Sequence, residues 1–218
     1  MPQLFKPRSN PLYRLVFILS TSAAVGALLF SVAWKWSDYE TEVDVSIMQP
    51  VPFSHKHHVG GLGLDCRYCH ASVEKTAQAG MPSTHTCMTC HSQVWQNAPM
   101  LEPVRESEAS GQPIPWQRVN RLPQYVYFDH SIHVNQGVGC TTCHGEVAEM
   151  PLTSKKRSFY MRDCLSCHRE PERYLRPREL VFDAHWQAPP DQIELGARLV
   201  AQYHIPKQRL TDCVTCHR

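Results

Sequence analysis

The chain has 218 residues, a length that ordinarily allows one or two domains. Its 22 lysine and arginine residues nearly balance 20 aspartate and glutamate residues, and the net charge is +2. That charge does not select a partner by itself, and we expect no nucleic-acid partner. No glycine-rich phosphate loop, nucleophile elbow or His-Glu metalloprotease helix occurs in the sequence, which excludes the reaction classes that depend on those motifs.

The first predicted element is a transmembrane anchor. Residues 15–34 contain no charged side chain, and as a helix they would span about 30 Å, the thickness of the hydrocarbon core of a bilayer. Lys6, Arg8 and Arg14 precede this apolar run and acidic residues follow it, so the positive-inside rule places the N-terminus in the cytoplasm. A cleaved signal peptide is the alternative, because residues 31–33 form a small-x-small cleavage site. Both interpretations predict that the rest of the chain is exported.

Five Cys-x-x-Cys-His motifs follow, and together they use every cysteine in the chain. The cysteine pairs are Cys66 and Cys69, Cys87 and Cys90, Cys140 and Cys143, Cys164 and Cys167, and Cys213 and Cys216, which are followed by His70, His91, His144, His168 and His217. This pattern predicts c-type haem sites, in which both thiols form thioethers to the porphyrin and the histidine is the proximal iron ligand. We therefore expect five covalently bound haems c and an electron carrier.

Zinc sites, redox dithiols and disulfides also use Cys-x-x-Cys units. A histidine follows all five units, although histidine supplies only 13 of the 218 residues, and this favours haem. Four-cysteine zinc sites would use the units in pairs and leave the fifth without a partner. A thioredoxin-like dithiol would accompany a βαβ pattern, which the sequence does not contain.

The predicted haems also determine the expected fold. Beyond the apolar run the chain offers fewer than about 40 residues for each haem, so side chains would be buried mainly against porphyrin. We expect a multihaem cytochrome c with mainly short α-helices and irregular loops around five haems, plus one N-terminal transmembrane helix. The 17 prolines and 10 glycines agree with this expectation.

An internal repeat, Phe-x-His-x-x-His, precedes the first and the third haem motifs. It covers residues 53–58 and 128–133, and each copy is followed by two haem motifs, which indicates a duplicated two-haem module. The i,i+3 spacing places both imidazoles on one face of a helical turn, so each turn can serve two neighbouring haems. The predicted distal iron ligands are His55, His58, His130 and His133.

Four distal histidines leave the sixth position of one haem open. Met150 and Met161 lie beside the third and fourth motifs, and a thioether ligand would raise the potential of that haem. The histidines interpreted as surface or propionate-contacting residues are His57, His85, His185 and His204. Two of them, His185 and His204, also compete with the methionines for the open position.

The order of these features predicts the organisation of the chain. The predicted segments are a cytoplasmic N-terminus over 1–14, the anchor over 15–35, a linker over 36–50, a first two-haem module over 51–100, a connecting loop over 101–124, a second two-haem module over 125–170 and a single-haem segment over 171–218.

The two modules resemble the small trihaem and tetrahaem class III cytochromes, in which the histidines of the repeat are distal ligands. The whole arrangement resembles the pentahaem cytochrome subunit of bacterial alternative complex III. The resemblance rests on the anchor, on Phe53 to His58 leading to Gly61-Leu62-Gly63-Leu64-Asp65-Cys66, on Gly80-Met81-Pro82-Ser83-Thr84 before Cys87, and on the lone C-terminal motif.

That resemblance implies a subunit of a quinol:electron-acceptor oxidoreductase, anchored in the cytoplasmic membrane with its haem domain on the periplasmic side. The implied partners are membrane lipid, polysulfide-reductase-like membrane subunits, a large iron-sulfur subunit related to molybdopterin enzymes, and a monohaem cytochrome c or another acceptor. Quinol would be oxidised in the membrane partner, so we expect no substrate chemistry in this chain. The family also implies bis-histidine haems with one His/Met haem, which favours Met150 or Met161.

Two other functions stay open at this point. A stand-alone membrane quinol dehydrogenase also combines one helix with several haems, although its first haem would follow the membrane helix more closely than Cys66 does. A catalytic multihaem reductase needs a haem iron with an open sixth position, whereas histidine is in surplus here.

Overall fold

The computed structural model describes residues 7–217, and the chain divides into two units, residues 1–43 and residues 44–218. Lys6, part of the predicted basic flank, lies outside the described residues. Each unit is considered by itself below.

Regular structure between residues 7 and 217 is helical, with isolated β-bridges, such as the one between Ser46 and Ser154, in place of strands. The α-helices are α1 (Asn10–Trp36), α2 (Asp38–Thr41), α3 (Cys66–Cys69), α4 (Thr84–His91), α5 (Glu102–Ser110), α6 (His130–Asn135), α7 (Cys140–His144), α8 (Met161–Arg169), α9 (Gln192–Gln202) and α10 (Cys213–Cys216). The 3-10 turns are η1 (Pro7–Ser9), η3 (Pro99–Leu101), η4 (Val147–Glu149), η5 (Pro171–Arg173), η6 (Arg178–Leu180) and η7 (Lys207–Arg209), and η2 (Lys56–Gly61) is a π-helical turn. The expected mainly helical fold is confirmed.

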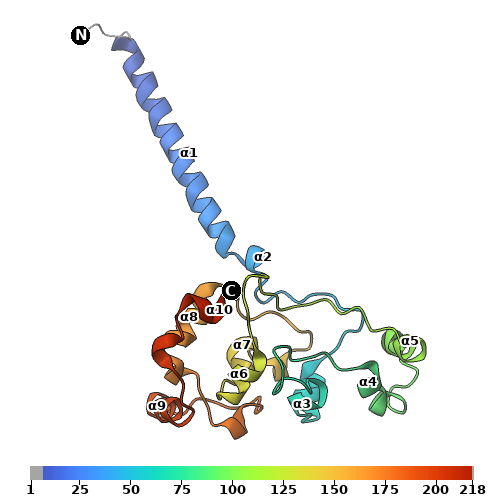
Figure 1. The fold of residues 1–218 in the computed structure, drawn as a ribbon. Helices are drawn as coiled ribbons and strands as arrows, with labels where there is room; N and C mark the ends of the chain where they lie inside the picture. The colour runs from blue at the N-terminus through green and yellow to red at the C-terminus, as the bar shows by residue number, and fades with distance from the viewer. Residues whose placement is uncertain (1–6, 218) are drawn as a thin grey trace. The chain divides into compact units, whose positions relative to one another are not determined.

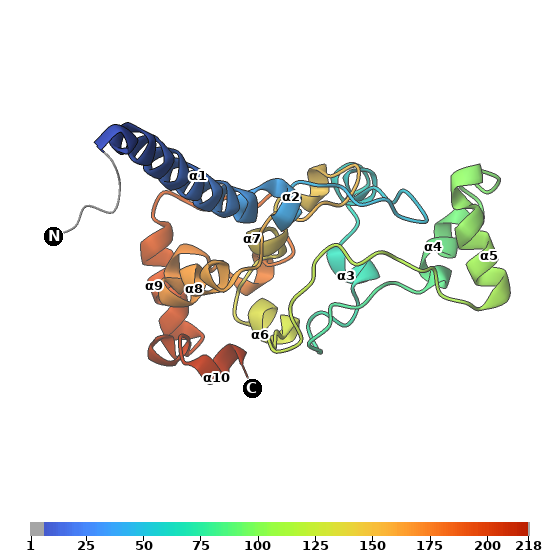
Figure 2. The same ribbon diagram turned by 90° about the horizontal axis from the view of Figure 1, so that it is seen from above.

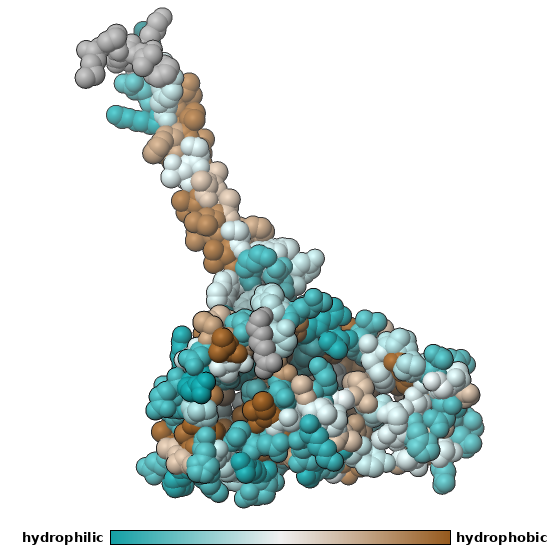
Figure 3. Space-filling model, viewed as in Figure 1, coloured by the Kyte–Doolittle hydropathy of each residue, from teal (hydrophilic) through white to brown (hydrophobic). Residues whose placement is uncertain are grey.

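The first unit consists chiefly of α1, a helix of 27 residues and therefore about 40 Å long. It begins at Asn10, five residues before the predicted start, because Pro11 occupies a position of the first turn that needs no N–H donor. No side chain of α1 is buried, and its surface is apolar over most of its length (Figures 1 and 3). Among the described residues this is the one helix long and apolar enough to cross a membrane.

The second unit is an elongated row of short helices. Figures 1 and 2 show α4 and α5 at one end of this unit, α3, α6 and α7 in the middle, and α8, α9 and α10 at the other end. Three of the predicted motifs are themselves single helical turns, namely α3, α7 and α10. The other two motifs form the C-terminal parts of α4 and α8.

The protein core of the second unit is sparse. Twelve apolar side chains are buried in the described part of the chain, and ten of them form three small separate clusters rather than one layer. One cluster contains Val73, Val134 and Val181, and another contains Leu175, Leu199 and Tyr203. A unit of this size normally buries a much larger apolar core, so another apolar body must complete the interior.

The segment predicted as a connecting loop, 101–124, contains helix α5. Val104 of α5 packs with Val51 and Ile114 beside Cys87, and the hydroxyls of Thr84 and Ser107 lie 2.6 Å apart. Proline, serine and glycine suggested a loop, but Pro103 lies in the first turn of α5 and Gly111 ends it in the left-handed conformation. The segment therefore packs against the first module.

The two copies of Phe-x-His-x-x-His, here called the first histidine turn (residues 53–58) and the second histidine turn (residues 128–133), pack across the modules. The Lys56 N–H donates to the Met150 carbonyl at 2.9 Å, which brings the first turn to the loop that follows α7. The Ser131 N–H donates to the Thr76 carbonyl at 3.2 Å, which brings the second turn to the loop that follows α3. Each turn thus packs on the segment behind the other module's first haem motif.

Candidate haem-binding site

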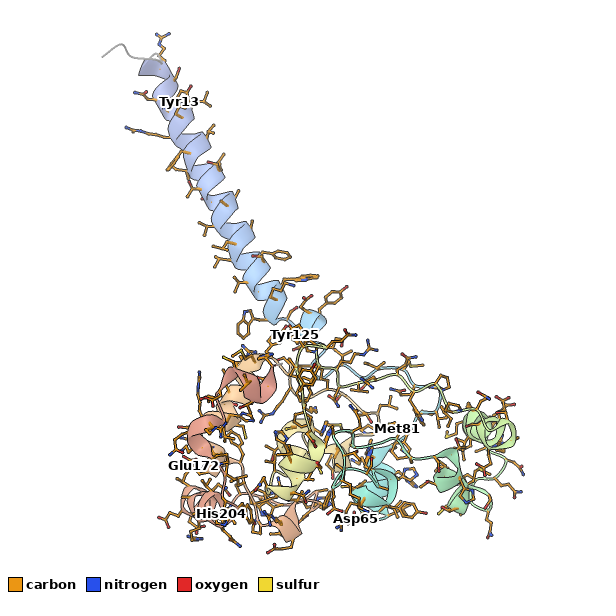
Figure 4. The ribbon with its side chains drawn as sticks, in the orientation of Figure 1. Tyr13, Asp65, Met81, Tyr125, Glu172 and His204 are labelled. Carbon is orange, nitrogen blue, oxygen red and sulfur yellow. The ribbon has the colours of Figure 1, made fainter. Side chains whose placement is uncertain are left out.

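Each Cys-x-x-Cys-His motif occupies about one turn of helix, which places its two thiols on one face. In α3 the turn begins at Asp65, whose carboxylate accepts a hydrogen bond from the Arg67 N–H and caps the helix (Figure 4 labels Asp65). No disulfide joins any of the ten cysteines, all of which lie in the described part of the chain. In this geometry the two thiols of a motif face the same edge of one bound ligand.

The thiols of the third and fourth motifs differ electrostatically from those of a redox dithiol. Burial, and then the nearby Cys143 thiol, raise the pKa of Cys167 to about 12, and burial also raises the pKa of Cys143. Catalytic Cys-x-x-Cys dithiols instead depend on a lowered thiol pKa. These two motifs are therefore poorly suited to thiol exchange.

Three histidines of the histidine turns lie opposite histidines of the haem motifs. The ring centroids are 6.2 Å apart for His58 and His91, 6.4 Å apart for His130 and His144, and 6.2 Å apart for His133 and His168. Two imidazoles that bind one metal ion at about 2 Å each have their centroids about 6 Å apart. The second histidine turn thus reaches two different motifs, as its i,i+3 spacing predicts.

The fourth predicted distal histidine, His55, lies near His70. Burial, and then the neighbouring His70 and His58, lower the pKa of His55 to about 4. Burial, followed by His130, likewise lowers the pKa of His144 to about 4. These imidazoles are neutral at pH 7, which is the form that binds iron.

All nine predicted ligand histidines have a hydrogen-bonding partner at Nδ1, at distances from 2.7 to 3.2 Å. The pairs are His55 with Thr153 Oγ1, His58 with the Ser54 carbonyl, His70 with Gly80, His91 with Val94, His130 with Ala77, His133 with Asp129, His144 with the Asn120 side chain, His168 with Leu210, and His217 with Tyr125. Metal-ligating histidines donate from one ring nitrogen to the protein and use the other for the metal. Nε2 is therefore available in all nine.

The phenylalanine of each histidine turn fixes the orientation of the imidazoles. Phe53 stacks on His58 with ring centroids 4.5 Å apart and meets His55 edge-on at 4.9 Å. In the second turn Phe128 stacks on His133 at 4.4 Å, and its contact with His130 is edge-on. The repeated phenylalanine is thus explained by aromatic packing.

The fifth motif is docked on the start of the second module. The Tyr127 N–H donates to the Cys216 carbonyl at 2.8 Å, and His217 Nδ1 donates to the Tyr125 carbonyl at 3.2 Å. Tyr125, labelled in Figure 4, also stacks on His217. Because the Tyr125 carbonyl accepts the hydrogen bond from His217 Nδ1, Tyr125 fixes the orientation of the imidazole and does not lie opposite it as a second iron ligand would.

The two candidate methionines occupy different surroundings. Met161 is 62% exposed at the first residue of α8, one turn before Cys164. Burial, and then the nearby Cys216 thiol, raise the pKa of Cys164, so this face of α8 lies beside the fifth motif. Met150 is 5% exposed and its carbonyl accepts from Lys56, beside the first histidine turn. Met161 therefore lies on a helix that borders the fifth motif, whereas the Met150 backbone contacts the first histidine turn.

The remaining histidines are exposed, and they are His57, His85, His185 and His204. His85 lies 3.1 Å from Glu108 in a surface ion pair, and His57 stacks on Trp95. These contacts agree with the surface interpretation of both residues.

Residues 51–107 and 126–218 match the family described as cytochrome c7 and related cytochrome c. The chain belongs to this family. The matched ranges begin close to the two histidine turns and include all five Cys-x-x-Cys-His motifs. Membership establishes a multihaem cytochrome c that transfers electrons through covalently bound haem.

A curated relative gives the family a more specific context. The chain is 31% identical over 162 residues to the multiheme cytochrome c subunit of menaquinone reductase from Nitratidesulfovibrio vulgaris, and the match covers 65% of this chain and 77% of the relative. The relative is thus a subunit of a quinone-linked enzyme.

The residues present fit the haem that the cytochrome c7 family implies. Paired imidazoles at the separation of two ligands on one metal, Nδ1 atoms already bonded to the protein, and a sparse apolar core are each what such a group requires. When bound, c-type haem supplies one-electron transfer. The cysteines would hold its edges and the histidines would hold its iron.

Two contacts of the site were missed by sequence reasoning. Thr153 and Asn120 touch His55 and His144, yet neither residue belongs to a motif. A single threonine or asparagine in a loop carries no sequence signal, because its role depends on the tertiary packing of the two modules.

Proposed function

We propose that this chain carries five haems c and relays electrons from quinol oxidation to a periplasmic acceptor within a membrane complex of the alternative complex III type. The observation that carries the proposal is the reach of the second histidine turn, whose His130 and His133 lie opposite His144 and His168. One turn that serves two haem motifs keeps both haems close together, as a relay requires. The quinone-linked relative supports the same assignment.

Four haems in this proposal have two histidine ligands each. The ligand pairs are His55 with His70, His58 with His91, His130 with His144, and His133 with His168. Bis-histidine ligation fills both axial positions, so these haems transfer electrons without binding substrate. The ring separations and the nine bonded Nδ1 atoms support this ligand set.

Contacts between cysteines support an order of the relay that differs from the order in the sequence. Cys69 lies near Cys87. After burial, the Cys87 thiol makes the largest contribution to the raised pKa of Cys69. The Cys66 and Cys140 side chains lie close together, which brings the first motif next to the third.

Two further contacts extend this order. Cys143 lies near Cys167, and Cys164 lies near Cys216. The inferred order of haem motifs is second, first, third, fourth, fifth. Figures 1 and 2 show α4, α3 and α7 in this order, with α8 and α10 together at the end of the row beyond α7.

The fifth haem would have His217 as its proximal ligand and Met161 as its distal ligand. The position of Met161 on the face of α8 that lies beside Cys216 supports this choice over Met150. A thioether ligand raises the potential relative to the bis-histidine haems, which suits the last carrier before an acceptor.

The anchor would be α1, with the N-terminus in the cytoplasm and the haem unit in the periplasm. Its length, its apolar surface and the basic Arg8 and Arg14 at its N-terminal end support this orientation. The proposed partners are polysulfide-reductase-like membrane subunits, an iron-sulfur subunit related to molybdopterin enzymes, and a monohaem cytochrome c or another acceptor.

Purification of the tagged chain from membranes in mild detergent tests this function. We expect the proposed partners to co-purify, the mass of the chain to include five haems, and added quinol to reduce those haems. A chain that purified alone with full quinol oxidation activity would contradict the multisubunit assignment. Fewer than five haems by mass would contradict the cofactor count.

The relative's name supports a second direction of electron flow, toward menaquinone. The same preparation separates the two directions. Haems that quinol reduces rapidly indicate quinol oxidation, whereas haems that quinol leaves oxidised, and that pass electrons to added quinone once reduced, indicate quinone reduction.

A further inference from the structure

Two of the nine Nδ1 partners are side chains, whereas the other seven are backbone carbonyls. Thr153 Oγ1 lies 3.0 Å from His55 Nδ1, and the Asn120 side chain lies 3.1 Å from His144 Nδ1. The two histidines that they contact serve the first and third motifs in the proposed ligand set, and these motifs lie close together at Cys66 and Cys140. The two central haem sites thus differ from the outer ones in how a ligand is held.

The amide of Asn120 has a defined orientation once His144 binds iron. Nδ2 faces His144 Nδ1, while Oδ1 is buried without a hydrogen-bonding partner. An imidazole that binds iron through Nε2 carries its proton on Nδ1, so two donors would face each other. A half-turn of the amide places Oδ1 against Nδ1–H and satisfies the buried oxygen as well.

Thr153 is held in place from both sides along the chain. Three residues earlier, the Met150 carbonyl accepts from Lys56, and one residue later, the buried Ser154 forms a β-bridge with Ser46. The hydroxyl therefore reaches His55 from a fixed loop, across 98 residues of sequence.

The strength of the acceptor at Nδ1 changes the electron density on the iron. A strong acceptor makes the imidazole more basic and stabilises ferric iron, which lowers the reduction potential. A threonine hydroxyl or a neutral amide is a weaker acceptor than a carboxylate, and it can be replaced without altering the backbone.

Resting on the proposed bis-histidine ligation, we propose that Thr153 and Asn120 are positioning residues that set the reduction potentials of the two central haems, one through His55 and the other through His144. They act on the iron through the ligand and do not touch it themselves. The potentials of the two haems in the middle of the relay can therefore be changed without a change of iron ligand.

Redox titration of the haem-loaded full-length protein, followed by absorbance and EPR, tests the proposal. Thr153→Val removes the acceptor and should raise the potential of one haem, shifting its ferric-to-ferrous ratio about tenfold, or about 59 mV for one electron. Thr153→Ser keeps the hydroxyl and should restore the original potential.

Two different substitutions of Asn120 should shift the reduction potential of the same haem in opposite directions. Asn120→Asp supplies a carboxylate and should lower the potential of the haem between His130 and His144, whereas Asn120→Leu should raise it. The planes of this pair are nearly parallel, at 5°, and those of His58 and His91 cross at 66°, so their low-spin EPR signals differ. Shifts of opposite sign are not produced by general loosening of the fold.

Asn97→Asp adds a charge to an exposed residue and Ser110→Ala removes a hydroxyl that contacts Glu106, so both serve as controls without an effect on the central haems. Equal potentials in wild type, Thr153→Val and both Asn120 variants would overturn the inference while leaving the proposed function intact. Absence of bis-histidine EPR signals from the wild-type protein would overturn the proposed function instead. If Thr153→Val fails to accumulate with its haems, the opposed pair at Asn120 decides alone.

Discussion

At each imidazole of the site, the nitrogen that faces the protein determines how the other nitrogen is used. His133 illustrates this, because Nδ1 donates to the Asp129 carbonyl of its own turn at 2.7 Å while the ring lies opposite His168. His85 illustrates the contrary case, since it is 79% exposed and pairs with Glu108. The same residue type therefore has two roles that burial and the Nδ1 partner distinguish.

Replacing His133 by methionine tests this distinction. We expect His133→Met to convert one bis-histidine haem to His/Met ligation, to raise its potential and to add a second near-infrared methionine-to-iron band. The matched control is His85→Met, which should leave every haem unchanged. A His133→Met protein with the wild-type spectrum would show that His133 is not a ligand.

The proposed thioether ligand can be tested in the opposite direction. Ferric wild-type protein should show one near-infrared methionine-to-iron band, and Met161→His should abolish it and lower the potential of that haem. Met48→His, at a residue that is 85% exposed, is the control. A band that persists in Met161→His excludes Met161 as the ligand.

The buried imidazoles also predict a pH dependence of stability. The pKa values of His55 and His144 are lowered to about 4, and an unperturbed histidine titrates near 6.5. As the pH falls from about 6.5 to about 4, these histidines are protonated in the unfolded chain but not in the folded chain. The free energy of unfolding therefore decreases by up to about 1.4 kcal/mol per pH unit for each histidine.

Guanidinium unfolding of the haem-loaded protein at a series of pH values measures this slope. His55→Gln should reduce the slope, and His85→Gln should not. An identical slope in wild type and His55→Gln would contradict the contribution of His55.

At the scale of elements, the first histidine turn depends on close contact between η2 and η4. A side chain on Gly60 would collide with the Ala148 carbonyl, whereas one on Gly61 would make ordinary contact, at 3.6 Å from the Lys56 carbonyl. Of these two adjacent glycines, therefore, Gly60 must lack a side chain and Gly61 need not.

Gly60→Ala should reduce the free energy of unfolding by about 1–3 kcal/mol and shift the spectra of the haems held by His55 and His58. Thermal unfolding followed in the haem absorbance measures both effects. Gly61→Ala is the matched control, with a change within about 0.5 kcal/mol. Equal stability of the two variants would show that the contact with η4 does not position the turn.

Elements differ in how far the sequence predicts them. The i,i+3 spacing of the histidines predicted a helical turn where α6 lies, because local spacing determines which side chains lie on one face. The Cys-x-x-Cys-His spacing predicted the candidate haem ligands, but it did not predict α3 or α7. Composition misassigned α5, since the buried side of Val104 depends on Val51 and Ile114 from distant segments. The pairing of His58 with His91 likewise depends on tertiary packing, so it could not be derived from spacing.

On the scale of the whole molecule, the sequence supplies a sensitive probe of topology, because all ten cysteines belong to haem motifs. A cysteine introduced elsewhere is then the only free thiol in the haem-loaded protein. Ser9 precedes α1 and Ser46 follows it, so they are suitable positions on either side of the anchor.

An impermeant maleimide applied to cells with a permeabilised outer membrane should label Ser46→Cys, and it should label Ser9→Cys only after lysis. The opposite result would reverse the orientation. A mature chain from which Ser9→Cys is missing would indicate cleavage of a signal peptide in place of an anchor.

The crossed packing of the two histidine turns has a consequence for maturation. His55 Nδ1 is held by Thr153 of the second module, and His130 Nδ1 is held by Ala77 of the first. If haem has been attached in only one of the two modules, the chain lacks part of the scaffold that orients the distal ligand of that module. We therefore expect attachment of the cofactors and completion of the fold to be interdependent, with a half-loaded intermediate more open to proteolysis until the second module is filled.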